Sequence, residues 1–406
     1  MAAKIIVVGG GAAGFFAAIA AAENGADVTV LEKTSRFLDK VRISGGGRCN
    51  VTHACFEPRE FAARYPRGGR ALLSPFQKFS ARDTVAWFES RGVKLKTEND
   101  GRMFPVTDSS QTIVNCLFDA AGKAGVTMRL NCTVESVLKT AEGQFELTLA
   151  RDEKIRCDKL LLATGGCRAA AAGQLAVSLG HTLEPPVPSL FTFQIETPWL
   201  LSLAGVSLEL AEVSAPTAKL RERGPLLVTH WGLSGPAILK MSAWGARALH
   251  GLNYQFPLIV NWLPESNAEK IAAEFHKRRE SAGAKLLVNV PVFPLTARLW
   301  EQLVLAAAIA RDTRWSALTR AQAHALAQQL VRTEFSVTGK SLNKDEFVTC
   351  GGVKLGDMDF KTMESRVCAG LFFAGELLDI DGLTGGFNFQ AAWTTGFIAG
   401  RALANT

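Results

Sequence analysis

A short apolar strand followed at once by closely spaced glycines constrains this chain more than any other stretch of its sequence. Residues 4–8 (KIIVV) form a continuous apolar run, which is typical of a strand buried in a parallel sheet. The next residues fit the pattern G-x-G-x-x-G through Gly9, Gly11 and Gly14, and a helix is predicted over residues 15–24. This succession predicts a turn in which glycine lets the backbone approach a ligand closely.

The same unit predicts a dinucleotide site. A second strand is predicted over residues 27–31 and ends at Glu32, about twenty residues past the glycines. The N–H groups at the start of the helix would bind a pyrophosphate, and the carboxylate of Glu32 would accept hydrogen bonds from ribose hydroxyls. This acid disfavours the 2′-phosphate of NADP even though Lys33 follows it, so the expected ligand is FAD or NAD.

The composition indicates an ordinary soluble protein. The 406 residues are 48% hydrophobic and 20% charged, which is enough for two or three cores. The apolar stretch 5–22 is not expected to be a signal peptide or a membrane span, because glycines interrupt it and only Lys4 precedes it as a basic residue. The eight cysteines show no C-x-x-C pair and no metal-ligand pattern with the six histidines, so we expect a cytoplasmic protein without a bound metal.

Basic residues gather just after the first Gly-rich region. Within residues 57–82 there are six basic side chains against two glutamates before Asp83, and the whole chain has a net charge of +7. If this stretch lines a cleft, it would bind phosphates of RNA or of a nicotinamide cofactor, and Arg64, Arg67 and Arg70 are the candidate substrate contacts. A basic run on a solvated surface is the alternative.

The fold class expected is α/β, with a Rossmann-like FAD-binding domain of the two-dinucleotide-binding type. Hydrophobic periodicity predicts helices over residues 80–91, 111–123, 234–250, 268–282, 297–310, 320–334 and 389–403, and strands over 126–130, 133–138, 145–149, 159–163, 191–195, 206–213 and 256–261. The proline-rich residues 185–188 are expected to mark a domain boundary.

The last sixty residues, like the first fifty, contain a predicted strand followed by glycines and a helix. Residues 371–376 (LFFAGE) read as a strand followed by glycine and an acid, and a Gly-rich loop over residues 379–390 leads into the last predicted helix. The N-terminus of that helix would stabilise negative charge on a reduced ring system, and Glu376 would bond the ribityl chain of a flavin. A second G-x-G-x-x-G for a separate nicotinamide domain is not found in the sequence.

Several motifs together resemble one known family. They are SGGGRCN at 44–50, THWGLSGP at 229–236, CGGV at 350–353, TMES at 362–365, and AGELLDIDG at 374–382 with TGGFNFQ at 384–390. In this order they are similar to the BaiN/RdsA-like family of FAD-dependent oxidoreductases, which have a glutathione-reductase-like FAD fold. The resemblance implies bound FAD and a nicotinamide reductant, NADH or NADPH, that docks without its own Rossmann domain. Family substrates include a uracil base of large-subunit ribosomal RNA, a steroid-like bile acid intermediate and aminoacetone.

The resemblance also implies three parts. These are an FAD-binding domain over residues 1–187 and 346–406, a β-rich middle domain over 188–266 and about 335–345, and a helical insertion over 267–334. Two departures suggest a distinct subgroup. Residues 38–40 (LDK) keep only Lys40 of the family's G-[KR]-K, and residues 167–174 replace a longer loop that contains an acid.

The expected cofactor contacts come from both ends of the chain. They are Gly9, Gly11, Ala12, Ala13, Gly14, Glu32, Lys33, Lys40, Gly46, Gly47, Arg48, Cys49, Asn50, Val134, Ala163, Thr164, Gly165, Gly375, Glu376, Gly385, Gly386, Phe387 and Asn388. Asn50 and the glycine amides of its loop would bond the edge of the flavin.

Two residues are candidates for proton transfer. The thiol of Cys49 is a candidate general acid beside the flavin, with packing behind the flavin as the alternative. His230 would stack on or protonate a substrate, or else serve as a hydrogen-bonded structural histidine.

The leading hypothesis is an FAD-dependent reductase that transfers hydride from NAD(P)H to an activated C=C, with uridine in ribosomal RNA as the best substrate guess. An FAD-dependent oxidase of a small amine such as aminoacetone is the second hypothesis. The third is a flavin-bearing RNA-binding protein without turnover. No membrane partner is expected.

Overall fold

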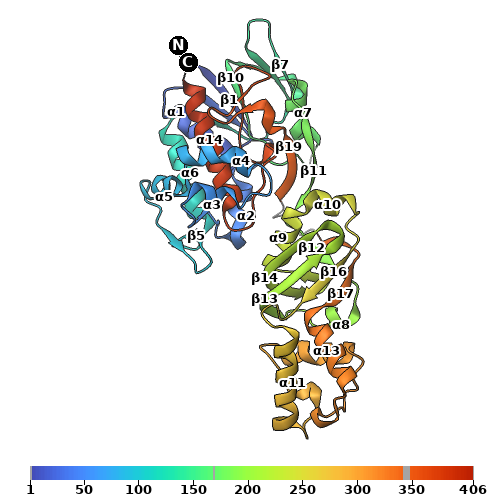
Figure 1. Cartoon of the computed structure of the whole chain (residues 1–406). Coiled ribbons are helices and arrows are strands. Elements are labelled where there is room, and N and C mark those ends of the chain that lie inside the picture. The colour runs from blue at the N-terminus through green and yellow to red at the C-terminus, as the bar shows by residue number, and fades with distance from the viewer. Residues whose placement is uncertain (1, 168–169, 342–347, 406) are drawn as a thin grey trace. The chain divides into compact units, whose positions relative to one another are not determined.

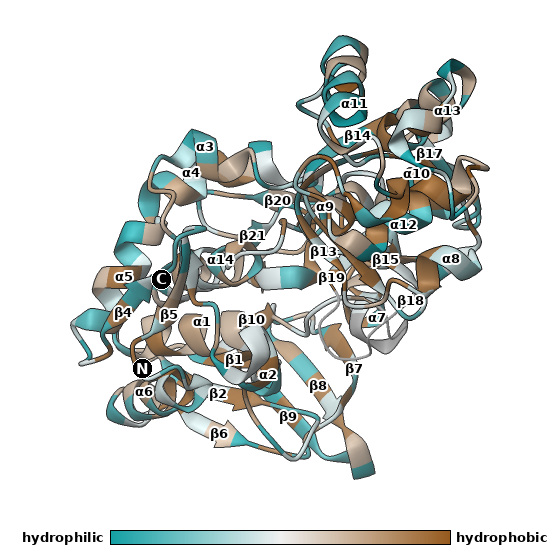
Figure 2. Ribbon diagram, turned by 90° about the horizontal axis from the view of Figure 1, so that it is seen from below, coloured by the Kyte–Doolittle hydropathy of each residue, from teal (hydrophilic) through white to brown (hydrophobic). Residues whose placement is uncertain are grey.

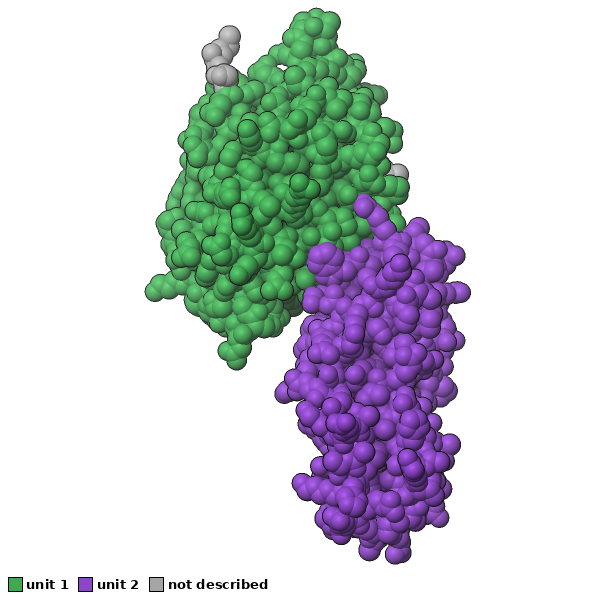
Figure 3. Space-filling view, viewed as in Figure 1, with its two compact units in different colours: residues 1–189, 343–406 green, residues 190–342 purple. Residues whose placement is uncertain are grey.

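The structure is a computed structural model that describes residues 2–167, 170–341 and 348–405. The chain divides into two compact units, residues 1–189 with 343–406 (unit 1) and residues 190–342 (unit 2), which Figure 3 shows in different colours. Unit 1 therefore contains both ends of the chain, as the blue and red elements of Figure 1 illustrate.

Unit 1 is built on a sheet with a parallel centre. Its strand order is β20-β21-β22-β10-β1-β2-β6, and the neighbours from β22 to β6 are parallel. The strands are β1 (Lys4–Val8), β2 (Asp27–Leu31), β6 (Thr127–Arg129), β10 (Lys159–Leu162), β20 (Met358–Asp359), β21 (Glu364–Ser365) and β22 (Leu371–Phe373). Because β22 pairs with β10, the C-terminal strand extends the sheet that the N-terminal strands begin. The predicted Rossmann-like α/β fold is confirmed.

Two helices from opposite ends of the chain pack closely in unit 1. They are α1 (Ala12–Ala22) and α14 (Phe387–Ala404), which lie side by side in Figure 1. A Cβ at Gly396 would lie 2.5 Å from the carbonyl oxygen of Ala13, and one at Gly400 would lie 2.3 Å from that of Ala17. Glycine on α14 thus allows a close backbone approach that packs the start of α1 against the middle of α14.

The other elements of unit 1 surround this centre. The helices are α2 (Asp39–Gly47), α3 (Pro58–Ala62), α4 (Gly69–Lys78), α5 (Ala81–Glu89), α6 (Ser110–Lys123) and α7 (Ala170–Ser178). The strands are β3 (Thr52–His53), β4 (Leu95–Thr97), β5 (Arg102–Pro105), β7 (Val134–Lys139), β8 (Phe145–Leu149), β9 (Lys154–Cys157), β11 (Leu183–Ser189) and β19 (Val348–Val353). The predicted N-cap of α5 is present, since Ser80 and Asp83 form a capping box.

Unit 2 is an antiparallel sheet with helices. The sheet order is β17-β16-β13-β14-β15-β12-β18. Its strands are β12 (Thr192–Gln194), β13 (Ser207–Ala215), β14 (Leu220–Thr229), β15 (Gly232–Ser234), β16 (Phe256–Asn261), β17 (Thr333–Val337) and β18 (Gly339–Ser341). Its helices are α8 (Pro198–Leu201), α9 (Pro236–Trp244), α10 (Ala246–Gly251), α11 (Ala268–Ala282), α12 (Ala297–Ala306) and α13 (Arg320–Val331). Hydrophilic residues cover much of α11 (Figure 2), which agrees with a surface helix.

Three predicted helices were wrong in part, and one of them, expected over 297–310, ends at Ala306. The helix expected over 234–250 is two helices, because Gly245 breaks the first, and a Cβ there would lie 2.2 Å from the Leu220 side chain. The helix expected over 320–334 ends at Val331, and Glu334 belongs to β17. Residues 185–188 are part of β11, whose antiparallel pairing with β19 is irregular between Glu184 and Val187 and so accommodates prolines.

The three-part domain division stays a prediction, and its boundary at 345/346 lies outside the described residues. Residues 168 and 169 of the replaced loop 167–174 also lie outside them. No helix within residues 2–167, 170–341 or 348–405 combines the length and apolar character needed to cross a membrane.

Candidate functional site

The first Gly-rich turn has the geometry of a phosphate-binding turn. Gly9 has a φ of +113°, and a Cβ on it would lie 2.3 Å from the carbonyl oxygen of Ala163. A Cβ on Gly14 would lie 1.9 Å from the carbonyl oxygen of Gly9, so both positions require glycine. Gly11 differs, because no atom lies within 4 Å of its Cβ position and it begins α1 without a side-chain cap. The first N–H groups of α1, at Ala12 and beyond, are therefore open to an anion.

Glu32 sits at the end of β2 as predicted. Its carboxylate accepts hydrogen bonds from the N–H of Gly10 at 2.8 Å and the N–H of Thr34 at 2.9 Å. These bonds fix the carboxylate beside the turn, and its remaining lone pairs can still accept from ribose hydroxyls. The side chain of Lys33 is exposed. The ribose role of Glu32 and the contact from Lys33 stay predictions.

The second Gly-rich loop forms the end of α2, where the backbone leaves the helical conformation from Ser44 onward, and is also open. Gly45, Gly46 and Gly47 have φ values of +58°, +68° and +83°, and no atom lies within 4 Å of the Cβ positions of Gly46 and Gly47. A planar ligand can therefore lie directly against this backbone. The side chain of Arg48, by contrast, forms an ion pair with Glu98 at 2.6 Å and lies over the ring of Phe104. The predicted contact of Arg48 with a cofactor stays a prediction.

Asn50 joins this loop to the C-terminal Gly-rich loop. With its amide oriented to satisfy both partners, the side chain donates to the carbonyl of Thr52 and accepts from the N–H of Gly386, each at 3.0 Å. Gly386 has a φ of +93° and begins α14 without a side-chain cap. The predicted bond from Asn50 to the flavin edge stays a prediction, since the amide retains one further N–H and one further lone pair after these two bonds. The two bonds hold together two backbone segments from opposite ends of the chain.

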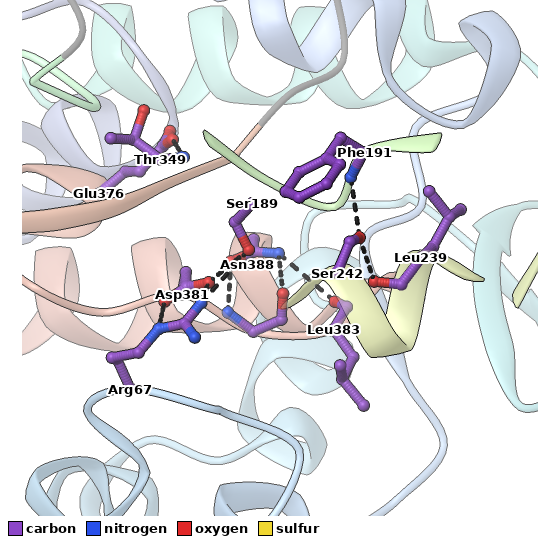
Figure 4. Close-up of polar contacts among 11 residues, drawn as sticks. Arg67, Ser189, Phe191, Leu239, Ser242, Thr349, Glu376, Asp381, Leu383 and Asn388 are labelled. Carbon is purple, nitrogen blue, oxygen red and sulfur yellow. Dashed lines mark hydrogen bonds and ion pairs between the residues drawn. The ribbon is translucent and has the colours of Figure 1, made fainter. Parts of the chain in front are cut away.

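The C-terminal loop is held by its own side chains. Asn388 donates to the carbonyl of Gly382 at 2.9 Å and accepts from the Gly382 N–H at 2.8 Å. Figure 4 shows these bonds as dashed lines from Asn388, next to Leu383. The ring of Phe387 is buried and stacks on His53, with centroids 4.7 Å apart. Asn388 and Phe387 thus shape the loop, and the backbone at Gly385 and Gly386 remains the predicted cofactor contact.

Glu376 connects three predicted segments. Its carboxylate forms an ion pair with Lys40 at 2.7 Å and accepts from the backbone N–H of Thr349 at 2.8 Å (Figure 4). A Cβ at Gly166, which follows Thr164 and Gly165, would lie 2.7 Å from the same carboxylate. Lys40, the one residue retained from the family's basic pair, therefore positions the acid of the A-G-E unit. Contacts of Glu376, Gly375, Thr164 and Gly165 with a cofactor stay predictions.

The basic stretch divides into two groups. Figure 4 shows Arg67, Asp381 and Ser189 pointing toward one another. Arg67 forms a two-pronged ion pair with the fully buried Asp381, and the Ser189 hydroxyl donates to the same carboxylate at 2.7 Å. The predicted substrate contact of Arg67 is wrong, because its guanidinium is committed to this pair. Arg64 and Arg70 are exposed, and in the described parts of the chain neither side chain forms an ion pair.

The structure argues against Cys49 as a proton donor. Its side chain is 0% exposed, and burial raises the pKa of the thiol to about 12. Because the protein itself covers the sulfur, a substrate lying on the loop would not contact it. The catalytic role predicted for Cys49 is therefore corrected to packing beneath the loop, which leaves its backbone, at a φ of +61°, as the part that shapes the turn.

His230 and Val134 lie elsewhere. His230 is exposed on the turn between β14 and β15 in unit 2, and Val134 begins β7 in unit 1. Nothing in their surroundings assigns them a role, and both stay predictions.

His53 is a candidate that sequence reasoning missed. Its ring Nδ1 is 3.1 Å from the carbonyl oxygen of Gly385, so that Nδ1 carries the hydrogen and donates. Burial lowers the pKa of the imidazole, and Arg64 adds to this effect while the bond to Gly385 opposes it. The residue lies three positions beyond Asn50, where the pattern T-H offered no distinctive signal. It is a titratable group that contacts the C-terminal Gly-rich loop at Gly385 and Phe387.

With the geometry established, comparison with known proteins identifies the family. The family model "HI0933-like protein Rossmann domain" matches residues 3–402. The chain belongs to this family. The resemblance to the BaiN/RdsA-like family is thereby confirmed, and the protein is an FAD-dependent oxidoreductase. The open glycine backbones at Gly11, Gly46 and Gly47, together with two uncapped helix N-termini, fit FAD.

Two curated relatives resemble nearly the whole chain. One is "Ribosomal RNA dihydrouridine synthase" of Escherichia coli, 31% identical over 394 residues, covering 94% of this chain and 93% of the relative. The other is "3-dehydro-bile acid delta(4,6)-reductase" of Clostridium scindens, 29% identical over 397 residues and covering 95% of each chain. Similar full-length relatives thus have different substrates.

Solved structures support the fold. The 3-ketosteroid-delta4-(5alpha)-dehydrogenase of Rhodococcus jostii has a TM-score of 0.54 at 15% identity, covering 100% of this chain and 97% of that chain. The flavocytochrome c3 fumarate reductase in its open conformation has a TM-score of 0.51 at 17% identity, covering 99% and 78%. At these identities the likeness concerns architecture alone.

Proposed function

We propose that this protein is an FAD-dependent reductase of an activated carbon–carbon double bond, with NADH or NADPH as electron donor and uridine in large-subunit ribosomal RNA as substrate. The observation that carries the proposal is the bond between Asn50 and Gly386, which holds the loop with the open backbone at Gly46 and Gly47 to the uncapped N-terminus of α14 from the other end of the chain. Bound FAD would supply hydride transfer between the donor and the substrate.

The choice of substrate rests on separate grounds. A relative 31% identical over nearly the whole chain is named a ribosomal RNA dihydrouridine synthase, and another is named a delta(4,6)-reductase, so both names describe reduction of carbon–carbon double bonds. The net charge of +7 favours the polyanionic substrate over the steroid, as do the exposed Arg64 and Arg70, which form no ion pair with any residue that the structure describes.

Anaerobic titration with NADH and NADPH tests the reductase chemistry. The flavin absorbance of the purified protein is expected to bleach with at least one of the two donors. Ribosomal RNA from a deletion strain is expected to lack one dihydrouridine, which the wild-type gene restores. Peroxide release with a small amine, without any reaction with NAD(P)H, would instead establish the oxidase. Bleaching by a donor with unchanged RNA would reject only the substrate.

We further propose that Cys49 does not donate a proton and that His53 is a positioning residue, whose Nδ1–H holds the carbonyl of Gly385 in the C-terminal Gly-rich loop. Cys49→Ala is expected to retain FAD and activity within a few-fold, because the thiol reaches no surface. His53→Ala removes the hydrogen bond that holds the Gly385 carbonyl beside the predicted flavin site, and is expected to lower kcat by roughly tenfold. The measurement is steady-state kinetics with flavin content as the folding control. The opposite ranking of the two variants would reverse the assignment.

A further inference from the structure

Unit 2 contains a pocket that none of the flavin-site residues lines. Its volume is about 530 Å³. The lining residues are Glu212, Ser214, Lys219, Leu220, Arg221, Ile259, Asn261, Gln328, Val331 and Arg332. They come from strands β13, β14 and β16 and from the end of helix α13, all labelled in Figure 1, with Lys219 in the turn between β13 and β14 and Arg332 just after α13.

Strand pairing places the polar residues of the floor in adjacent rows. Ser214 on β13 lies opposite Arg221 on β14 and Ile259 on β16. In the next row, Glu212 lies opposite Arg223 and Asn261. Residues directly opposite one another share one face of a sheet, so the pocket has a polar floor that spans three strands. The alternate residues of β13, such as Val213, are fully buried on the other face.

A buried carboxylate orients two arginines in this floor. Glu212 is only 7% exposed, and its two oxygens contact Arg221 and Arg223, each at 2.5 Å. Burial alone would raise the pKa of Glu212, but the hydrogen bonds from the two guanidinium groups lower it below its usual value. Each guanidinium has five N–H donors, so both retain donors after binding Glu212. The side chain of Arg221 remains 68% exposed at the pocket.

The charge of the lining is positive. The lining residues include three basic side chains, those of Lys219, Arg221 and Arg332, and one carboxylate, that of Glu212. Arg332 is paired with Glu334 at 3.1 Å, whereas within the described ranges the ammonium of Lys219 forms no ion pair. Ser214, Asn261 and Gln328 add neutral hydrogen-bonding groups. Fixed guanidinium donors with a nearby free ammonium are the groups that recognise phosphate.

We propose that this pocket binds a phosphate group, with Arg221 and Lys219 as its principal contacts and Glu212 as the residue that positions Arg221. The phosphate belongs either to a small nucleotide or to the phosphodiester backbone of an RNA. The proposal does not rest on the substrate proposed above, because a nucleotide ligand would fit any reductase of this family.

Calorimetric titration of the FAD-loaded protein tests the proposal. The probes are inorganic pyrophosphate, ADP and a short single-stranded RNA. The wild type is expected to bind at least one probe saturably, and Lys219→Ala and Arg221→Gln are each expected to weaken that binding by roughly tenfold. Arg311→Ala is the matched control, since it removes one exposed positive charge from unit 2 outside the pocket, and its binding is expected to equal that of the wild type.

The probes distinguish the two sources of phosphate. Weakened binding of ADP and pyrophosphate in the pocket variants supports a small nucleotide, and weakened binding of RNA alone supports a phosphodiester. Absence of binding by all three probes would overturn the proposal, as would an equal loss in Arg311→Ala. Lys219→Ala changes only an exposed side chain, so the test remains decisive if Arg221→Gln does not fold.

Discussion

Replacing Asp381 by alanine is expected to destabilise the protein by about 3–5 kcal/mol and to cost it bound FAD. Asp381 is fully buried. Within the described residues, its side chain forms an ion pair with Arg67 and accepts a hydrogen bond from the Ser189 hydroxyl. Its removal would leave the guanidinium of Arg67, whose side chain is 11% exposed, without its counter-charge. The residue also lies inside the loop 379–390, so the loss would loosen the segment that leads into α14.

The pKa of Asp381 explains why this pair is sensitive. Burial raises the pKa of its carboxyl group, while the hydrogen bond and charge of Arg67 act in the opposite direction. The ionised carboxylate is therefore tolerated only because the arginine and the hydroxyl surround it. Removing either member alone leaves an uncompensated charge, whereas removing both does not.

A double-mutant cycle tests this reasoning. Asp381→Leu and Arg67→Met are each expected to be strongly destabilising alone, and their combination is expected to recover most of the loss, because an apolar pair replaces two buried charges. Urea unfolding measures the stability and flavin absorbance measures the cofactor content. Arg70→Met, which changes an exposed arginine three residues away, is the control and is expected to change stability by no more than about 0.5 kcal/mol. Additive effects in the cycle would contradict the coupling.

This pair also shows what the sequence could not reveal. Arg67 stood in a run of basic residues and was predicted to bind substrate phosphates, but its partner lies 314 positions further along the chain. Local charge pattern carries no information on such a contact. The same limit applies to Cys49, because a position after three glycines suggests an open loop, whereas the fold turns the thiol inward.

Sequence patterns predicted correctly those elements whose structure depends on residues close by in the chain. The strand at residues 4–8, the turn from Gly9 to Gly14 and the acid at Glu32 were all predicted, because their spacing follows from a single strand–turn–helix unit. The strand that contains the prolines at 185–188 was missed for the opposite reason. A strand that tolerates them depends on an irregular pairing with β19, which lies far away in sequence.

The second large effect is expected from a substitution of Gly14 in the first Gly-rich turn. Gly14→Ala is expected to destabilise the protein by about 1–3 kcal/mol or more, and to prevent FAD binding, although alanine is the better helix former. The reason is that its Cβ would lie 1.9 Å from the carbonyl oxygen of Gly9, so that the turn and the start of α1 would have to separate. Thermal unfolding followed by circular dichroism measures the stability, and flavin content measures binding.

Gly11→Ala separates folding from cofactor binding at the same turn. Gly11 has a φ of −92°, which alanine adopts without strain, and no atom lies within 4 Å of its Cβ position. The fold is therefore expected to lose at most about 1 kcal/mol. The added methyl group would instead occupy the space where a pyrophosphate approaches the backbone, and loss of one charge-assisted hydrogen bond there is expected to weaken FAD binding by roughly tenfold or more. Equal FAD affinity in Gly11→Ala and the wild type would show that the phosphates do not lie against this turn. Loss of stability in Gly11→Ala as large as in Gly14→Ala would show that both glycines serve packing alone.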